Sequence, residues 1–117
     1  MLAFQVEIGP RECTQPSPDD MRPYSLCLAE TFNNETERKL QHQLRHAVRG
    51  LRASKGAQAA SQLRSNQRHW DRQRHQTCAH EAVDAPVSEQ ARVELTCLSN
   101  AADTRIARLT VMSRHVR

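Results

Sequence analysis

The sequence predicts an all-α fold, a small up-down-up bundle of three helices built on a long helical hairpin and stapled by disulfides. Apolar residues recur at helical spacing over three long stretches, and glycine- or proline-containing segments separate these stretches. Only four of the 117 residues are aromatic Phe, Tyr or Trp, so the predicted core is thin. We expect an irregular N-terminal arm over residues 1–23, one three-helix domain over residues 24–113 and a frayed end over residues 114–117.

The expected arm is non-helical. Phe4, Val6 and Ile8 alternate with polar residues, which is typical of a short extended segment. Several helix breakers then follow, namely Gly9, Pro10, Pro16, Pro18 and Pro23.

The first helix is expected over residues 24–51. Its apolar stripe has steps of three, four or eight residues and comprises Leu28, Phe32, Leu40, Leu44, Val48 and Leu51. Gly50 and residues 53–56 supply the predicted turn, because glycine is favoured just past a helix end.

The second helix is expected over residues 57–80, with an unusual stripe. Its spacing puts an amide, a large ring, a guanidinium and a thiol on one helix face, formed by Gln67, Trp70, Arg74 and Cys78. Such a face needs specific partners, and we interpret it as a structural seam between helices rather than a ligand site.

The third helix is expected after a connection at residues 83–86. Ser88 is its predicted N-cap, and Glu89 lies in the first turn, where negative charge suits the helix dipole. The apolar face then runs through Ala91, Leu95, Leu98, Ala102, Ile106, Leu109 and Met112.

The register of the hairpin predicts partners for the seam. If the turn is centred near residues 52–53, Cys27 lies level with Cys78, and Glu30 lies nearly level with Arg74. We therefore expect Arg74 to stack on Trp70 and to form a charge-assisted hydrogen bond with Glu30.

Four widely spaced cysteines, Cys13, Cys27, Cys78 and Cys97, do not have the spacing of a metal site. They favour two disulfides and an oxidising compartment, although four buried thiols in a cytosolic protein are the alternative. The register argument favours Cys27–Cys78 with Cys13–Cys97. The sequential pairing, Cys13–Cys27 with Cys78–Cys97, stays open.

Positive charge is concentrated in the hairpin. Residues 38–74 contain ten basic residues and one acid, Asp71, so this segment carries +9 and the rest of the chain −5 of the net +4. A solvated helix face and a surface that attracts an acidic partner explain this equally well. The residues that we expect to bind the partner are Arg45, Arg49, Arg52, Lys55 and Arg64.

No catalytic, metal or cofactor site is predicted. His42 and His46 are four residues apart, but no third ligand accompanies them. Nothing resembles a nucleophile with its base, and cysteines in disulfides cannot act as nucleophiles. Nucleic acid is a poor partner for an exported protein whose basic residues are not interleaved with a series of aromatic residues for stacking on bases. No stretch reaches the roughly 20 apolar residues of a membrane span.

The run of Gln67, Trp70, Arg74 and Cys78 resembles the second-helix motif of the lysozyme-inhibitor LprI-like family of small exported helical bacterial proteins. Cys97-Leu98 followed by Arg105, Ile106 and Leu109 resembles its closing motif, and Cys13 and Cys27 resemble its first cysteine pair. The resemblance covers roughly residues 13–112. Three features depart from the family: Thr36 stands where an Asp is common, Ala102 where a Thr is common, and a glycine-rich insertion is missing.

The resemblance implies a sequential disulfide pairing, because some relatives have their last two cysteines close together. It also implies that Leu98, Arg105 and Leu109 join the seam. The function that it implies is non-enzymatic: an exported protein, periplasmic or secreted, that inhibits a lysozyme-like peptidoglycan-degrading enzyme or acts as an immunity-type factor against one. Because many lysozymes are cationic, inhibition has to use the acidic end of the bundle or a less basic target, such as a secreted effector. The alternative is an envelope structural or anion-binding module whose basic hairpin end binds an acidic envelope component.

Overall fold

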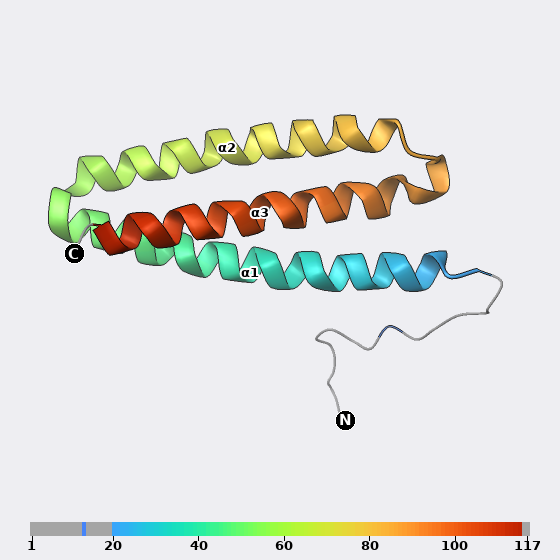
Figure 1. Ribbon diagram of the computed structural model, residues 1–117. Coiled ribbons are helices and arrows are strands. Elements are labelled where there is room, and N and C mark those ends of the chain that lie inside the picture. Colours follow the sequence, from blue (N-terminus) through green and yellow to red (C-terminus); the bar gives the residue numbers. More distant parts are fainter. Residues whose placement is uncertain (1–12, 14–19, 116–117) are drawn as a thin grey trace, which may run out of the picture.

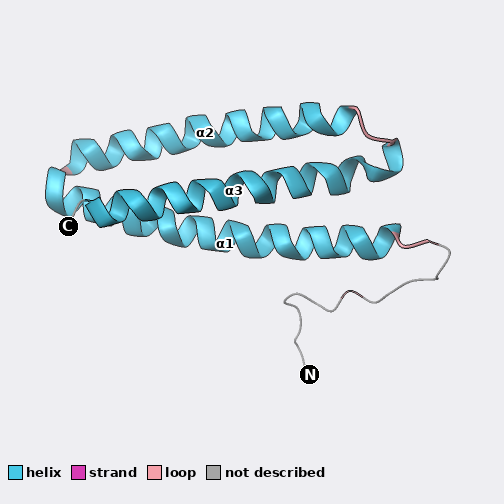
Figure 2. Cartoon of the chain, viewed as in Figure 1, coloured by secondary structure: helices cyan, strands magenta, loops and turns pink. Residues whose placement is uncertain are grey.

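The computed structural model describes residue 13 and residues 20–115. It contains α1 (Arg22–Lys55), α2 (Ala57–Val83), the short 3-10 helix η2 (Val87–Glu89) and α3 (Gln90–His115). The helices run antiparallel in sequence order, and α3 returns alongside both α1 and α2 (Figures 1 and 2). The predicted all-α bundle is confirmed.

Both ends of the bundle are more helical than expected. Arg22 and Pro23 belong to the first turn of α1, where proline is tolerated because its missing N–H has no intrahelical acceptor. At the other end, α3 continues through Arg114 to His115. The rest of the expected arm, apart from Cys13 and residues 20–21, lies outside the described residues, as do residues 116–117.

The turn between α1 and α2 is a single residue, Gly56. Its φ of 99° and ψ of 174° lie in a region that is essentially restricted to glycine. Its backbone N–H donates to the carbonyls of Leu51 and Arg52, both at 3.1 Å, and so closes the end of α1. Of the expected turn at Gly50 and residues 53–56, only Gly56 is confirmed. The expected centre at residues 52–53 is wrong, because these residues and Gly50 lie inside α1, and the hairpin folds later in the chain.

The connection between α2 and α3 also differs from the expectation. Ser88 is not the N-cap of the third helix, because it lies within η2 and is exposed. The N–H of Glu89 instead donates to the carbonyl of Pro86 at 2.8 Å. The chain therefore enters α3 through a tighter turn rather than through a serine cap.

The core is narrow and rich in small residues. Ala47, Ala60 and Ala102 are almost completely buried, one on each helix, and they allow the three backbones to approach closely. Larger buried side chains fill the remaining space, namely Leu40, Val48, Leu63, Leu98 and Leu109. Burying one such aliphatic side chain contributes about 1.5–3 kcal/mol.

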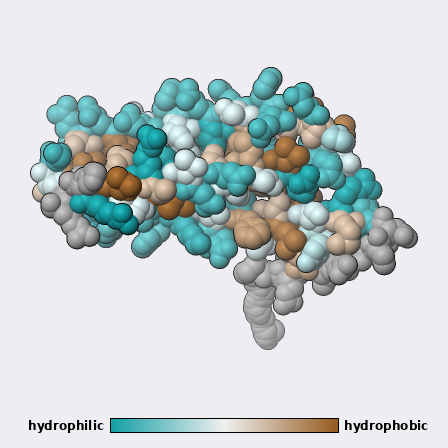
Figure 3. Space-filling model, viewed as in Figure 1, coloured by the Kyte–Doolittle hydropathy of each residue, from teal (hydrophilic) through white to brown (hydrophobic). Residues whose placement is uncertain are grey.

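The first part of the expected stripe on α1 is wrong. Phe32 is 63% exposed and Leu28 is also exposed. An eight-residue step rotates a helix position by about 80°, so Phe32 is turned away from the face that Leu40 buries. Thr36, one turn before Leu40, occupies the buried face instead. The face of the molecule shown in Figure 3 is mostly hydrophilic, with scattered apolar side chains.

Candidate functional site

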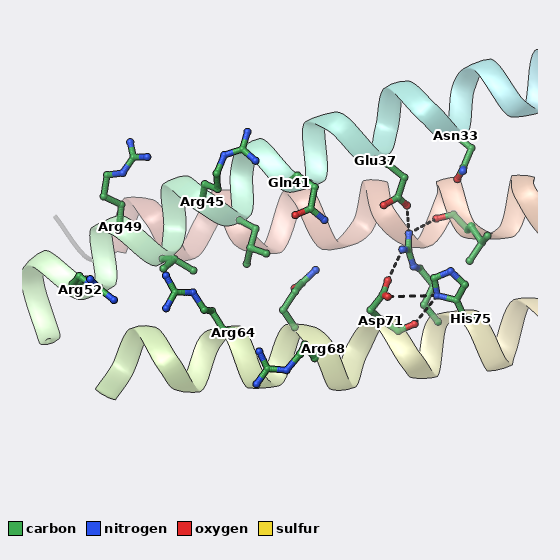
Figure 4. A pocket seen from close by; sticks show the side chains of 15 residues that line it. Asn33, Glu37, Gln41, Arg45, Arg49, Arg52, Arg64, Arg68, Asp71 and His75 are labelled. Carbon is green, nitrogen blue, oxygen red and sulfur yellow. Dashed lines mark hydrogen bonds and ion pairs between the residues drawn. The ribbon is translucent and has the colours of Figure 1, made fainter. Parts of the chain in front are cut away.

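A groove of about 790 Å³ lies between α1 and α2, with Leu98 of α3 among the residues that line it. Figure 4 shows this groove with α1 and α2 on its two sides and the ribbon of α3 behind it. It runs from Asn33 to Arg52 along α1 and from His75 back to Arg64 along α2. Five arginines lie toward the Gly56 end, and two carboxylates, Glu37 and Asp71, lie toward the other.

Arg74 ties the three helices together at the acidic end of this groove. Its Nη1 donates to Oε2 of Glu37 on α1 at 2.5 Å and to the Leu98 carbonyl of α3 at 3.3 Å. Its Nη2 donates to Oδ1 of Asp71, one turn earlier on α2, at 2.5 Å. The Arg74 side chain is only 3% exposed, so these acceptors compensate a charge that water does not reach.

The expected pairing of Arg74 with Glu30 is wrong, because Glu37 holds the guanidinium and Glu30 is exposed. The cause is the register of the hairpin. Glu37 and Arg74 lie at nearly equal distances along the chain from Gly56, the observed turn, whereas Glu30 was level with Arg74 only for the earlier turn.

The rest of the seam assembles around Trp70, which is half-buried. The guanidinium carbons of Arg74 and Arg105 lie 4.8 Å and 5.4 Å from the centre of a Trp70 ring, within cation–π range. Nε of Arg105 donates to Oε1 of Gln67 at 2.8 Å, which links α3 to α2. Burial, and secondarily the charge of Arg108, lowers the pKa of Arg105.

Two disulfides frame the bundle in the sequential pairing. Cys13 is joined to Cys27 near the start of α1, and Cys78 of α2 is joined to Cys97 of α3. The Cys27–Cys78 pair of the register argument does not form, because the later turn puts Cys27 well beyond the level of Cys78. The bridge at Cys78 lies one helical turn from Arg74, so it fixes α2 and α3 beside the ion-pair network.

The basic residues expected to bind a partner are all exposed. Arg45, Arg49, Arg52 and Arg64 line the groove, whereas Lys55 does not. In Figure 4, Arg64 points from α2 into the space between the helices, and Arg45 and Arg49 extend from the α1 side away from α2. None of these four arginines forms an ion pair within the described part of the chain.

Among the charged residues of this site, sequence reasoning did not assign Arg68, which adds a fifth arginine, or the carboxylates Glu37 and Asp71. Counting outward from Gly56 rather than from residues 52–53 places Glu37 level with Arg74. The glycine at position 56 is therefore the sequence signal that identifies this pair, provided that it is taken as the turn. The arrangement presents exposed cations above three apolar side chains, those of Leu44, Val48 and Leu98.

The described helices include none that is long and apolar enough to cross a membrane. No curated protein and no solved structure matches the chain. A family model described as lysozyme inhibitor LprI matches residues 13–109, a segment that contains both disulfides, the Arg74 network and the groove. Because this match covers most of the sequence, the chain belongs to the lysozyme inhibitor LprI family.

Proposed function

We propose that this protein is an exported, non-enzymatic inhibitor of a lysozyme-like peptidoglycan-degrading enzyme, acting in the periplasm or outside the cell. Family membership is the observation that carries the proposal. The two disulfides support it further, because such bonds persist in oxidising compartments.

The surface that we assign to the enzyme is the basic end of the hairpin, formed by Arg45, Arg49, Arg52, Lys55 and Arg64. A lysozyme-type cleft contains two catalytic carboxylates, one of which must be ionised and the other protonated for hydrolysis. Cations placed beside them favour the ionised form of both and so oppose general acid catalysis. An enzyme with a cationic surface would be repelled, so a less basic muramidase, such as a secreted antibacterial effector, suits this surface best.

The test is a titration of the protein against a panel of muramidases that includes secreted effectors, with hydrolysis of peptidoglycan as the readout. A specific inhibitor reduces activity in proportion to its molar ratio and stops at saturation. Full activity of every enzyme at a large excess of the protein contradicts the proposal.

A matched pair of variants assigns the surface. R45E/R49E reverses two charges on the basic end, and R38E/R72E reverses two exposed arginines that do not line the groove. We expect inhibition to weaken at least about tenfold in R45E/R49E, which corresponds to about 1.4 kcal/mol, and to remain in R38E/R72E. Equal losses in both variants would indicate a general effect of charge.

A second candidate function is an envelope anion-binding module. The groove arginines that find no carboxylate within the described chain favour it, because they are free to bind an external anion. This function predicts binding to vesicles that contain phosphate-bearing lipid, with affinity that falls as salt rises. Binding that R45E/R49E leaves unchanged would exclude the basic end as the anion site.

A further inference from the structure

The groove between α1 and α2 contains more than a patch of charge. We propose that it binds a short, extended acidic segment of a polypeptide, with carboxylates at the arginine rim and apolar side chains against Leu44 and Val48. The assignment of this segment to the inhibited enzyme rests on the proposed function. The binding of such a segment in the groove is independent of the proposed function.

The groove carries positive charge that the described residues do not neutralise. The groove is lined by Arg45, Arg49, Arg52, Arg64 and Arg68, and none of them pairs with a carboxylate of the described residues. Arg22 and Arg92 each pair with one carboxylate, and Arg74 pairs with two. Five unpaired guanidinium groups along one groove leave planar donors that fit carboxylates in two-point contacts.

The groove has an apolar floor. Leu44 and Val48 lie on the same face of α1, four residues apart, and Leu98 adds an apolar side chain from α3. Leu98 is only 8% exposed, so a flat membrane surface does not reach it. Among the described residues, the lining contains no Phe, Tyr or Trp on which the bases of a single-stranded nucleic acid would stack. Apolar side chains of a polypeptide can pack against this floor, whereas a ligand with carboxylates alone cannot.

The groove has a limited length, and its two ends differ in charge. From Asn33 to Arg52 the helix rises roughly 28 Å, which an extended chain of about eight residues spans. At the far end Glu37 and Asp71 share a single arginine, Arg74, and Asp71 also lies 3.6 Å from Nδ1 of His75. With His75 neutral, the lining at this end carries a net negative charge. A uniform polyanion is repelled at that end, whereas a short segment with its carboxylates near Gly56 is not. Alternate side chains of such a segment face the floor and the rim.

The probe is a capped eight-residue peptide, here called the Glu/Leu peptide, in which Leu alternates with Glu in one half and with Ser in the other half. It is compared with a peptide in which Ser replaces each Leu. Both carry the same charge, so a difference between them measures the floor. Binding to the disulfide-bonded protein is followed by calorimetry and by the methyl NMR signals of leucine and valine. We expect the Glu/Leu peptide to bind about tenfold more tightly and to shift the methyl signals of Leu44 and Val48, but not those of the exposed Val83.

Charge variants locate the rim. R45E/R64E, with one reversal on each side of the groove, weakens binding of the Glu/Leu peptide about tenfold, and R38E/R72E changes it less than about twofold. Thermal melting shows whether each variant folds. Equal affinity for the two peptides, equal losses in the two variants, or unmoved Leu44 and Val48 signals would each overturn the groove as the site.

The same variants separate this inference from the proposed function. Peptide binding without inhibition of any muramidase supports the groove and contradicts the proposed function. Muramidase inhibition that survives unchanged in R45E/R64E supports the inhibitor and contradicts the groove as the place where it holds the enzyme.

Discussion

Arg74 of α2 and Glu37 of α1 form an ion pair across the hairpin, 37 residues apart in sequence, with 2.5 Å between Nη1 and Oε2. The same guanidinium reaches Asp71 on its own helix and the Leu98 carbonyl on α3. One buried cation therefore fixes the relative positions of all three helices and closes the acidic end of the groove.

Removing the Glu37 carboxylate should destabilise the protein, because Arg74 keeps only Asp71 as a charged partner. We expect Glu37→Ala to lower the free energy of unfolding by about 1–3 kcal/mol. Glu30→Ala is the control, since Glu30 is exposed, and it should stay within about 0.5 kcal/mol. Urea denaturation of both variants measures this difference. A larger loss of stability in Glu30→Ala than in Glu37→Ala would support the pairing of Arg74 with Glu30 instead.

The two glycines of the hairpin should respond oppositely to alanine. Gly56→Ala forces a side chain into φ near 99°, and we expect it to cost about 1–3 kcal/mol even though a Cβ there meets no other atom within 4 Å. Gly50→Ala lies inside α1 and should stabilise by up to about 1 kcal/mol through helix propensity. Thermal melting of the pair tests the position of the turn, and melting points that shift in the same direction would contradict it.

The contributions of Arg105 and Gln67 to stability should be coupled, because the two side chains share a hydrogen bond. Arg105→Met leaves the buried Gln67 carbonyl oxygen without its donor, which should cost about 1–3 kcal/mol. Gln67→Leu together with Arg105→Met removes both partners and should cost less than the two single changes added together. A double-mutant cycle by denaturation measures this coupling. Strict additivity would show that the contact does not contribute.

The start of α1 offers a test by titration. The side-chain hydrogen bond from Arg22, helped by its backbone N–H and its charge, lowers the pKa of Asp20 from 3.8 to about 2. A lowered folded-state pKa favours the ionised form, so this contribution is present above pH 3.8 and is lost as the pH falls through about 2. In an NMR titration, Arg22→Ala should raise the pKa of Asp20 toward 3.8, and Arg92→Ala should not move it.

Much of the fold followed from local pattern. The three helical stretches, the face that carries Gln67, Trp70 and Arg74, and the concentration of arginine in the hairpin all depend on residue type and spacing. These are properties of neighbours three or four positions apart, and they do not require knowledge of the fold.

The tertiary structure decided which residues meet. The spacing on α2 predicts that Arg74 needs an acidic partner, but a turn displaced by three or four residues changes that partner from Glu30 to Glu37. It also separates Cys27 from Cys78. The physical reason is that each residue advances a helix by 1.5 Å and turns it by 100°, so a small error in the turn becomes a different set of contacts along the whole hairpin. The groove combines residues of α1 and α2 with Leu98 of α3, and no spacing within one helix contains that information.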